Sequence, residues 1–233
     1  MKSEIKAALI LLAAGSGVRF GHSTNKVWLP LSGRRIISRS LANASRNFKD
    51  ARIILVINPD DEEIAHATLQ RELSGLKVEV VHGGATRHES EYNALVYLAP
   101  QIESGEIEVV LIHDGARPLA TPALFVEIAT TAHRHGGAIP TIAVDQHELD
   151  TVRSDTVVRV QTPQGFVARQ LLAAYQKAAI DGFTGTDTSA CMEKYFPEIK
   201  TVSITADVSN VKITYPQDLI IAEHVLAKRG YKD

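Results

Sequence analysis

Residues 7–29, AALILLAAGSGVRFGHSTNKVWL, decide the fold class of this chain. Their first part, Ala7–Leu12, is a continuous apolar run, which predicts a strand buried on both faces of a parallel sheet. The residues that follow are small: Ala13, Ala14, Gly15 and Gly17. A backbone without bulky side chains can turn tightly and bring its N–H groups close to an anion. Because Arg19 and Lys26 add positive charge, the segment predicts a polyphosphate cradle at the end of a strand.

This loop differs from two widespread phosphate-binding loops. A Walker loop ends in Gly-Lys-Ser/Thr, and a dinucleotide fingerprint opens directly into a helix. A tight turn between a strand and a helix, with incidental surface charges, would also explain the loop taken alone. The rest of the chain must therefore decide between a cradle and a simple turn.

Length and composition favour one domain over residues 1–233, with 45% hydrophobic residues for a large core. The net charge of -2 gives no electrostatic footprint for nucleic acid or an anionic membrane, so neither is expected as a partner. The single cysteine, Cys191, cannot form an intramolecular disulfide. Neither a signal-peptide pattern nor an apolar run of about 18 residues is present, and we expect a cytoplasmic protein.

Strand-like and helix-like segments alternate along the chain. After the first strand, further strands are predicted at Arg52–Ile57, Lys77–Val81, Glu108–Ile112 and Ala138–Ile142. Amphipathic runs predict helices near Ile36–Phe48, Asp61–Leu73, Arg87–Leu98 and Pro122–His135. This succession predicts an α/β fold with a doubly wound, mostly parallel sheet and helices on both faces. The polar, β-branched region at about 145–161 departs from the pattern and is expected to form a short β-arm.

Two polar clusters follow predicted strands, where open parallel sheets bind their ligands. In GGATRHES, Gly83 and Gly84 allow close backbone approach, Arg87 can pair with a phosphate, and Ser90 can donate a hydrogen bond. A Gly-Gly turn before a capped helix would also explain most of this cluster.

The second cluster, HDGARP at residues 113–118, presents a carboxylate at the end of an apolar strand. Asp114 is well placed to bind a divalent metal that carries substrate phosphates, since Mg²⁺ commonly uses one or two protein carboxylates. The alternative for Asp114 is an ion pair with Arg117.

Near the C-terminus, NVKITYPQDL puts Lys212 in a β-like stretch before a helix entered through Pro216. A lysine that alternates with Val211 and Ile213 points away from both of them. Periodicity leaves two options for Lys212, which points either to solvent or into the site.

Seven short motifs in this order resemble those of the 2-C-methyl-D-erythritol 4-phosphate cytidylyltransferases of the non-mevalonate isoprenoid pathway, within the wider sugar-phosphate nucleotidyltransferases. They cover nearly the whole chain: LAAGSGVRFG with Lys26, GGATRHES, HDGARP, DT at 150–151, TPQGF at 162–166, TDTSA at 186–190 and NVKIT at 210–214. The resemblance implies a single Rossmann-like nucleotidyltransferase domain. It also implies a homodimer that takes CTP and a small sugar-alcohol phosphate as substrates.

The resemblance assigns roles to single residues. It implies that Arg19 and Lys26 stabilise the transition state, that Lys212 positions the attacking phosphate, and that Asp114 binds Mg²⁺ or another divalent cation. The residues implied to bind the nucleotide are Ala13, Ala14, Gly15, Gly17, Gly83, Gly84, Arg87, Ser90, Asp114 and Gly115. Those implied to surround the second substrate are Thr151, Thr162 and Thr186.

The chain departs from the family pattern in two places. Members usually carry a longer hairpin between the Asp-Thr and Thr-Pro-Gln motifs, which acts as a dimerisation arm and sends an arginine into the neighbour's site. Here ten residues separate Thr151 from Thr162, and Arg153 and Arg159 are both candidates for that arginine. Ser209 stands where many members have an acidic residue, so the metal would depend on Asp114, phosphates and waters, or recruit Asp207.

Two other functions remain open at this point. A ribitol 5-phosphate cytidylyltransferase would share most of these motifs. A nucleotide-binding protein without transfer activity would explain the shortened arm and the serine at 209. Because a binding module does not need the full set of Arg19, Lys26, Asp114 and Lys212, we expect an enzyme. The reaction would transfer CMP from CTP to 2-C-methyl-D-erythritol 4-phosphate.

Overall fold

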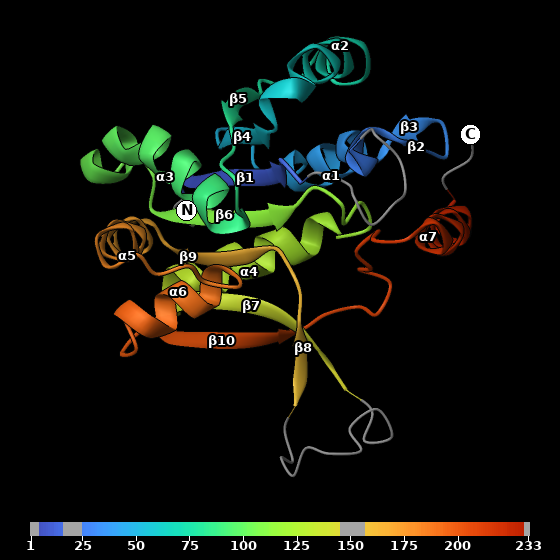
Figure 1. Ribbon diagram of the computed structural model, residues 1–233. Helices are drawn as coiled ribbons and strands as arrows, with labels where there is room; N and C mark the ends of the chain where they lie inside the picture. Colours follow the sequence, from blue (N-terminus) through green and yellow to red (C-terminus); the bar gives the residue numbers. More distant parts are fainter. Residues whose placement is uncertain (1–4, 16–24, 145–156, 231–233) are drawn as a thin grey trace.

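A computed structural model describes residues 5–15, 25–144 and 157–230 of the chain. One mixed, mostly parallel sheet forms its centre (Figure 1), with strands in the order β10-β7-β9-β6-β1-β4-β5 and β8 paired to β7. Its strands are β1 (Ala7–Ala13), β4 (Arg52–Ile57), β5 (Glu79–His82), β6 (Val109–Asp114), β7 (Gly136–Ala143), β8 (Val158–Val160), β9 (Gln164–Val167) and β10 (Lys200–Thr205).

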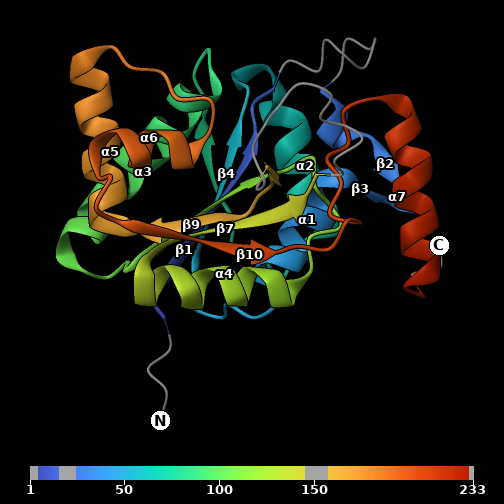
Figure 2. The ribbon, with the colours of Figure 1, turned by 90° about the horizontal axis from the view of Figure 1, so that it is seen from below.

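The helices cover both faces of this sheet, as Figure 2 shows for α4 on one face and α3, α5 and α6 on the other. The α-helices are α1 (Ile36–Ser45), α2 (Glu62–Glu72), α3 (Arg87–Ser104), α4 (Pro122–His135), α5 (Ala168–Asp181), α6 (Thr188–Tyr195) and α7 (Pro216–Lys228). The short elements are the 3-10 turns η2 (Lys26–Trp28) and η3 (Pro59–Asp61) and the hairpin of β2 (Pro30–Leu31) with β3 (Arg34–Arg35).

Alternation along the central strands builds two hydrophobic layers. Leu9 and Leu11 of β1 face the layer that α1 and α4 complete. Ala8 and Ile10 face the opposite layer, which α3, α5 and α6 complete. Because both faces are covered, β1 reads as an unbroken apolar run rather than an alternating one. The doubly wound, mostly parallel α/β sheet predicted from the sequence is therefore confirmed.

The five predicted strands and four predicted helices are all present, with small shifts at their ends. α1 stops at Ser45, three residues before the predicted end, whereas α3 continues past Leu98 to Ser104 and accommodates Pro100. Gly105, at φ 83°, then ends α3 in the left-handed conformation that glycine adopts without strain. Thr86 caps the start of this helix, since its hydroxyl accepts a hydrogen bond from the amide of Glu89 at 3.1 Å.

The main difference from the sequence prediction is β9, a short antiparallel strand between β6 and β7. Its residues, Gln164–Val167, include a glutamine and a glycine and lack the apolar run that marks β1. Pairing with neighbours on both sides stabilises a segment whose own sequence has little strand character.

The expected β-arm at about 145–161 is described only in part. Val158–Val160 forms β8 and pairs antiparallel with Thr141–Ala143 at the end of β7, so the paired part of the arm begins before residue 145. Residues 145–156 lie outside the described part of the chain. Among the described residues, the helices include none with the length and apolar composition to cross a bilayer.

Candidate active site

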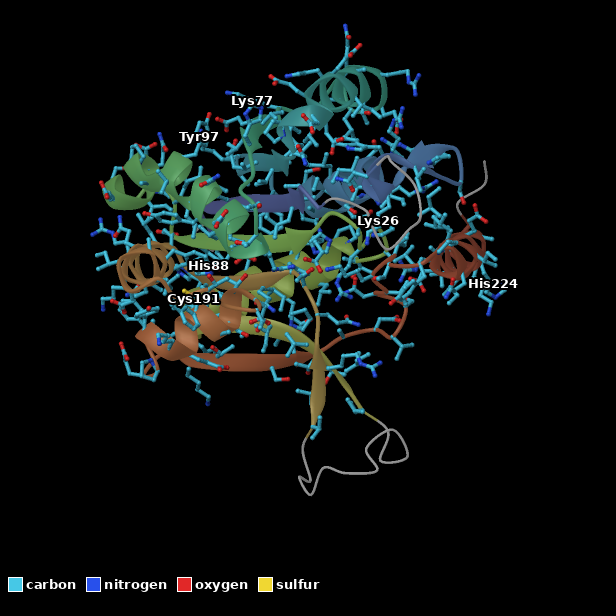
Figure 3. All side chains as sticks on the ribbon, in the orientation of Figure 1. Lys26, Lys77, His88, Tyr97, Cys191 and His224 are labelled. Atoms are coloured by element: carbon cyan, nitrogen blue, oxygen red, sulfur yellow. The ribbon has the colours of Figure 1, made fainter. Side chains whose placement is uncertain are left out.

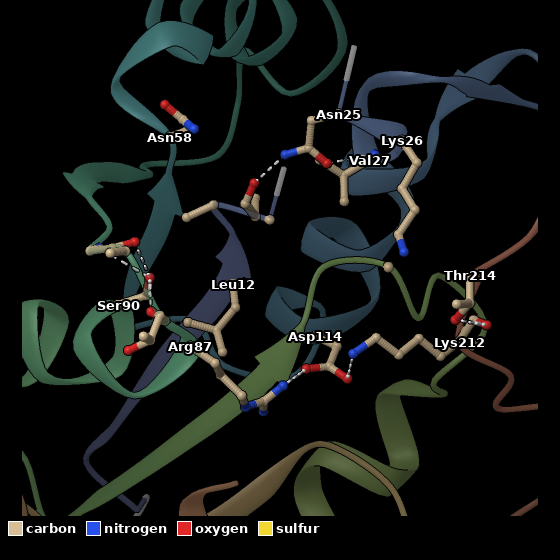
Figure 4. Close-up of a pocket in the computed structure, with 17 residues that line it drawn as sticks. Leu12, Asn25, Lys26, Val27, Asn58, Arg87, Ser90, Asp114, Lys212 and Thr214 are labelled. Atoms are coloured by element: carbon tan, nitrogen blue, oxygen red, sulfur yellow. Dashed lines mark hydrogen bonds and ion pairs between the residues drawn. The ribbon is translucent and has the colours of Figure 1, made fainter. Parts of the chain in front are cut away.

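A cavity of about 590 Å³ opens at the carboxyl ends of β1, β4 and β6 (Figure 4). Sequence-predicted residues from both ends of the chain line it: Ala13, Ala14, Gly15, Lys26, Gly84, Arg87, Ser90, Asp114 and Lys212. Parallel strands bring their carboxyl ends to the same edge of the sheet, so loops distant in sequence meet there. Asn25, Asn58 and Thr214 also line the cavity and had not been predicted.

Asp114, the last residue of β6, lies at the centre of a cluster of positive charges. Its Oδ1 pairs with Nη1 of Arg87, and its Oδ2 lies 3.0 Å from Nζ of Lys212. Oδ2 also lies 3.4 Å from Nε of Arg117. The ion pair with Arg117 that the sequence offered as an alternative is therefore present, together with two further cations. One carboxylate holds three cationic side chains from separate segments.

The surroundings of Asp114 determine its ionisation. Burial favours the neutral acid, but Arg87, Lys212 and Arg117 outweigh it and hold the pKa of Asp114 well below its usual range. Burial also disfavours the guanidinium of Arg87, but Asp114 and Glu91 outweigh it and raise the pKa of Arg87. Both groups stay charged at neutral pH, and among the described residues that line the cavity the cationic side chains outnumber the single carboxylate, Asp114. The site is therefore suited to an anionic ligand.

Lys26 begins η2 and extends into the cavity (Figure 4). Asn25 holds this point of the chain, because its amide Nδ2 donates to the carbonyl of Ala13 and to Oδ2 of Asp61. Its Oδ1 accepts from the amide of Val27 at 3.4 Å. Asn25 thus ties the end of β1 to the start of η2. An asparagine just before a short turn is a capping signal that sequence reasoning had not used.

The Gly-Gly turn after β5 is held by side chains of α3. The hydroxyl of Ser90 accepts from the amide of Gly84 at 3.1 Å and donates to the carbonyl of Thr86 at 2.9 Å. The carboxylate of Glu89 accepts from the amide of Ala85 at 2.7 Å. These hydrogen bonds fix the backbone of the turn beside the cavity. A binding site needs such support, because its groups must be held in position before the ligand arrives.

Lys212 points into the site, which settles the choice left open by periodicity. The β-like stretch expected around it is wrong, since residues 210–215 form no strand. Ile213 is buried and its amide donates to the carbonyl of Ala116 at 2.9 Å, which orients Lys212 towards Asp114. The amides of Thr214 and Tyr215 donate to Asp218 of α7, so the helix cap replaces strand pairing.

Thr162 contacts the back of Asp114 rather than the cavity. Its hydroxyl oxygen accepts from the amide of Asp114 at 3.0 Å and lies 3.1 Å from Nδ1 of His113. Nε2 of His113 donates to the carbonyl of Arg117 at 3.2 Å, so the neutral ring accepts the Thr162 proton at Nδ1. Complete burial lowers the pKa of His113 to about 4. His113 and Thr162 together fix the HDGARP turn.

Other predicted residues lie away from the cavity lining. The amide of Gly115 donates to the carbonyl of Leu12 at 2.9 Å, and the amide of Gly83 donates to the carbonyl of Ile57 at 2.8 Å. Both glycines therefore join neighbouring strand ends through their backbone. Thr186 is exposed just before α6, and Arg159 is exposed on β8. The remaining four predicted residues lie outside the described part of the chain: Gly17, Arg19, Thr151 and Arg153.

The described lining of the cavity offers a divalent cation few protein ligands. Asp114 is the one carboxylate among the described residues that line the cavity, and the described chain holds no group of three or more potential His, Cys, Asp or Glu ligands. Asp207 is exposed outside this lining and accepts from the amide of Ser209 at 2.7 Å. One ionised carboxylate beside cationic side chains fits an ion that brings most of its ligands as phosphate oxygens and waters.

Comparison with known proteins agrees with this geometry. A family model for 2-C-methyl-D-erythritol 4-phosphate cytidylyltransferase matches residues 7–228. The chain belongs to this family. The cytidylyltransferase of that name from Bacillus mycoides is 34% identical over 226 residues, which cover 94% of this chain and 96% of the relative. The one from Geobacillus kaustophilus is 35% identical over 228 residues, with the same shares of the two chains covered.

A solved structure supports the same family. The 4-diphosphocytidyl-2C-methyl-D-erythritol synthase from Anaerococcus prevotii matches with a TM-score of 0.78 and 28% identity, covering 95% of this chain and 96% of that one. This member of the 2-C-methyl-D-erythritol 4-phosphate cytidylyltransferase family is thus a nucleotidyltransferase with the family's fold. The enzyme class expected from the sequence is confirmed.

Proposed function

We propose that the enzyme transfers CMP from CTP to 2-C-methyl-D-erythritol 4-phosphate and releases pyrophosphate. The proposal rests on the cavity at the carboxyl end of β6, where Arg87 and Lys212 contact Asp114 and Lys26 lines the same cavity. Membership of the cytidylyltransferase family supplies the substrate class. A cluster of fixed cations is suited to a triphosphate and to a phosphate monoester that must meet each other.

We propose that CTP lies along the edge formed by Ala13–Gly15 and the Gly-Gly turn. The triphosphate would approach the end of β1 and Lys26, where small residues leave room for phosphate oxygens. The cytosine would lie against the backbone of Gly83 and Gly84, which can match a pyrimidine edge. Gly17 and Arg19 would extend the cradle beyond the described residues.

The chemistry needs no covalent enzyme intermediate, because a phosphate monoester is already an ionised nucleophile at neutral pH. One of its oxygens attacks the α-phosphorus of CTP in line. A new P–O bond forms, the bond from the α-phosphorus to the bridging oxygen breaks, and pyrophosphate leaves with that oxygen. The enzyme contributes alignment and positive charge, from Lys212 on the acceptor and from Arg19 and Lys26 on the transferring phosphate.

We propose Mg²⁺, or another divalent cation, as the cofactor. Asp114 would hold it, and Lys212 would exchange Oδ2 of Asp114 for the acceptor phosphate. The half-exposed side chain of Lys212 leaves room for this movement. When bound, the ion would neutralise charge on the triphosphate.

The acceptor would lie between the HDGARP turn and the start of α6. Thr151 and Thr186 are the proposed neighbours of its polyol chain, with Arg153 or Arg159 as the arginine of the arm, and Thr162 would support Asp114 from behind. A homodimer would bring that arm to the neighbouring site. Sedimentation at micromolar concentration would test the dimer, and a cytoplasmic location remains a prediction for cell fractionation.

A pyrophosphate-release assay tests the reaction. The enzyme is incubated with Mg²⁺, each of the four nucleoside triphosphates, and either methylerythritol phosphate or ribitol 5-phosphate. Release with CTP and methylerythritol phosphate alone is the expected result. Release with ribitol phosphate instead would move the proposal to the alternative acceptor, and no release with any pair would contradict it.

A further inference from the structure

Glu91 is a fully buried carboxylate in the second turn of α3, and sequence reasoning gave it no role. Its Oε1 accepts from Nε of Arg87 at 2.9 Å and from the hydroxyl of Thr188 at 3.2 Å. Its Oε2 accepts from the phenol of Tyr175. Three donors from three helices therefore converge on a single side chain.

The contact with Arg87 determines how that guanidinium is presented to the site. Nε of Arg87 binds Glu91 and Nη1 binds Asp114, so the planar group lies between two carboxylates. A planar fork held at two points has one orientation, which a single ion pair does not guarantee. Without Glu91, Arg87 would keep its partner in the cavity but lose the contact that fixes its other side.

The contact with Thr188 extends the connection to a second segment. Thr188 is the first residue of α6 and follows Thr186, a proposed neighbour of the acceptor. A parallel contact comes from His88, whose Nδ1 accepts from the amide of Gly185 at 3.4 Å and whose ring stacks on Tyr175 at 4.5 Å. Figure 3 shows where His88 lies relative to Lys26 in the fold. The first turns of α3 thus contact both the Gly-Gly turn and residues 185–188.

Stability alone does not explain a buried glutamate at this position. Burial raises the pKa of Glu91, against the opposing influence of Arg87 and the hydroxyls of Tyr175 and Thr188. Replacing a buried ion pair with apolar side chains of similar volume is often neutral or stabilising. The helices that carry Glu91 and its partners contribute Ala94, Leu171 and Met192 to one apolar layer. The polar contacts of Glu91 therefore point to a role in the site.

We propose that Glu91 is a positioning residue that couples the two substrate sides of the active site. It orients Arg87 against Asp114 on the nucleotide side and holds Thr188 at the start of α6 on the acceptor side. One buried carboxylate thereby fixes the position of the nucleotide side relative to the acceptor side. This inference rests on the proposed transfer from CTP to methylerythritol phosphate.

The test compares Glu91→Gln and Thr188→Val with a matched control, Glu103→Gln, on the exposed end of α3. Glu91→Gln keeps the shape of the side chain but removes its charge, so kcat is expected to fall by about tenfold to a hundredfold through misalignment. Thr188→Val removes the acceptor-side link alone, so KM for methylerythritol phosphate should rise while KM for CTP stays unchanged. Glu103→Gln should match the wild type.

Unfolding temperatures are measured for all variants to separate positioning from loss of fold. Wild-type kinetics in Glu91→Gln would overturn the inference, as would a loss of activity that only follows the loss of folded protein. Thr188→Val supplies an independent answer if Glu91→Gln does not fold. Equal changes in the two KM values of Thr188→Val would also count against the coupling.

Calorimetric titration with CTP distinguishes a failure of the inference from a failure of the proposed function. A wild-type enzyme that binds CTP but releases no pyrophosphate would contradict the transfer reaction, and Glu91 would then be judged by binding. Weaker CTP binding in Glu91→Gln than in Glu103→Gln would support the orientation of Arg87. Equal affinities in those two variants would overturn it.

Discussion

Single residues show how this site concentrates charge. Asp114 is ionised although it is buried, because Arg87, Arg117 and Lys212 surround it. A buried charge without partners would be too costly to keep, so these side chains depend on one another. The cations also exceed what one carboxylate neutralises. The remaining positive charge faces the cavity, where an anionic substrate would neutralise it.

Lys26 gives the most direct prediction at this scale. Lys26→Ala is expected to lower turnover by about 10²–10³, the usual cost of losing one preorganised contact to transition-state charge. The fold should remain intact, because the side chain extends into the cavity. Turnover is measured by pyrophosphate release and folding by circular dichroism. Lys77→Ala is the control, since Lys77 is exposed away from the site (Figure 3), and near-normal turnover in Lys26→Ala would refute the role.

His113 predicts how stability depends on pH. The folded state lowers its pKa from 6.5 to about 4, so between these values the unfolded chain binds more protons than the folded protein. The free energy of unfolding should therefore fall as the pH drops through this window, by about 3 kcal/mol in all, at about 1.4 kcal/mol per pH unit. Urea denaturation of the wild type and of His113→Gln at several pH values isolates this contribution.

The difference in the free energy of unfolding between the two proteins is the quantity to follow, because other titratable groups also change the stability of both proteins as the pH falls. It should shrink as the pH falls from 6.5 towards 4. A difference that stays constant across this range would contradict the neutral, buried state of His113.

At the scale of elements, the junction between β5 and α3 is the most sensitive to volume. A Cβ at Gly83 would lie 2.5 Å from Cβ of Ala14 and 2.7 Å from Oγ of Ser90. Gly83→Ala is therefore expected to lower the free energy of unfolding by about 1–3 kcal/mol, the usual cost of overpacking. Chemical denaturation measures this loss.

Gly15→Ala is the matched variant, because a Cβ at Gly15 would meet no atom of the described residues within 4 Å. Its stability should stay close to that of the wild type, while CTP binding should weaken if phosphates approach the backbone there. Stability equal in the two variants would contradict the close approach of β1, β5 and α3 at Gly83.

For the whole molecule, we expect the metal to be needed for activity but not for the stability of the fold. Chelation with EDTA is expected to stop pyrophosphate release and to leave the unfolding temperature unchanged, because the described chain contains no group of three or more potential ligands that would make a metal structural. Adding Mg²⁺ should restore release. A drop in unfolding temperature on chelation, measured without nucleotide, would show a structural metal instead.

The sequence predicted the strands with long apolar runs well and missed β9 and β10. β1, β4 and β6 are buried on both faces, so their apolar runs mark them without help from neighbours. β9 contains a glutamine and a glycine, and β10 alternates polar with apolar residues. Pairing decides their conformation: β9 lies antiparallel to β6, and β10 lies parallel to β7. Lys212 shows the same dependence, since the capping of α7 by Asp218 removed the expected strand around it.

The sequence by itself determined the fold class and identified Lys26, Arg87, Asp114 and Lys212 as candidate site residues, because these follow from local composition and motif order. Only the tertiary structure decided that Lys212 faces Asp114, that Thr162 supports Asp114 from behind, and that Glu91 joins α3 to α6. Side-chain direction in loops and contacts between distant segments depend on packing across the sheet. No periodicity in a single chain segment encodes such packing.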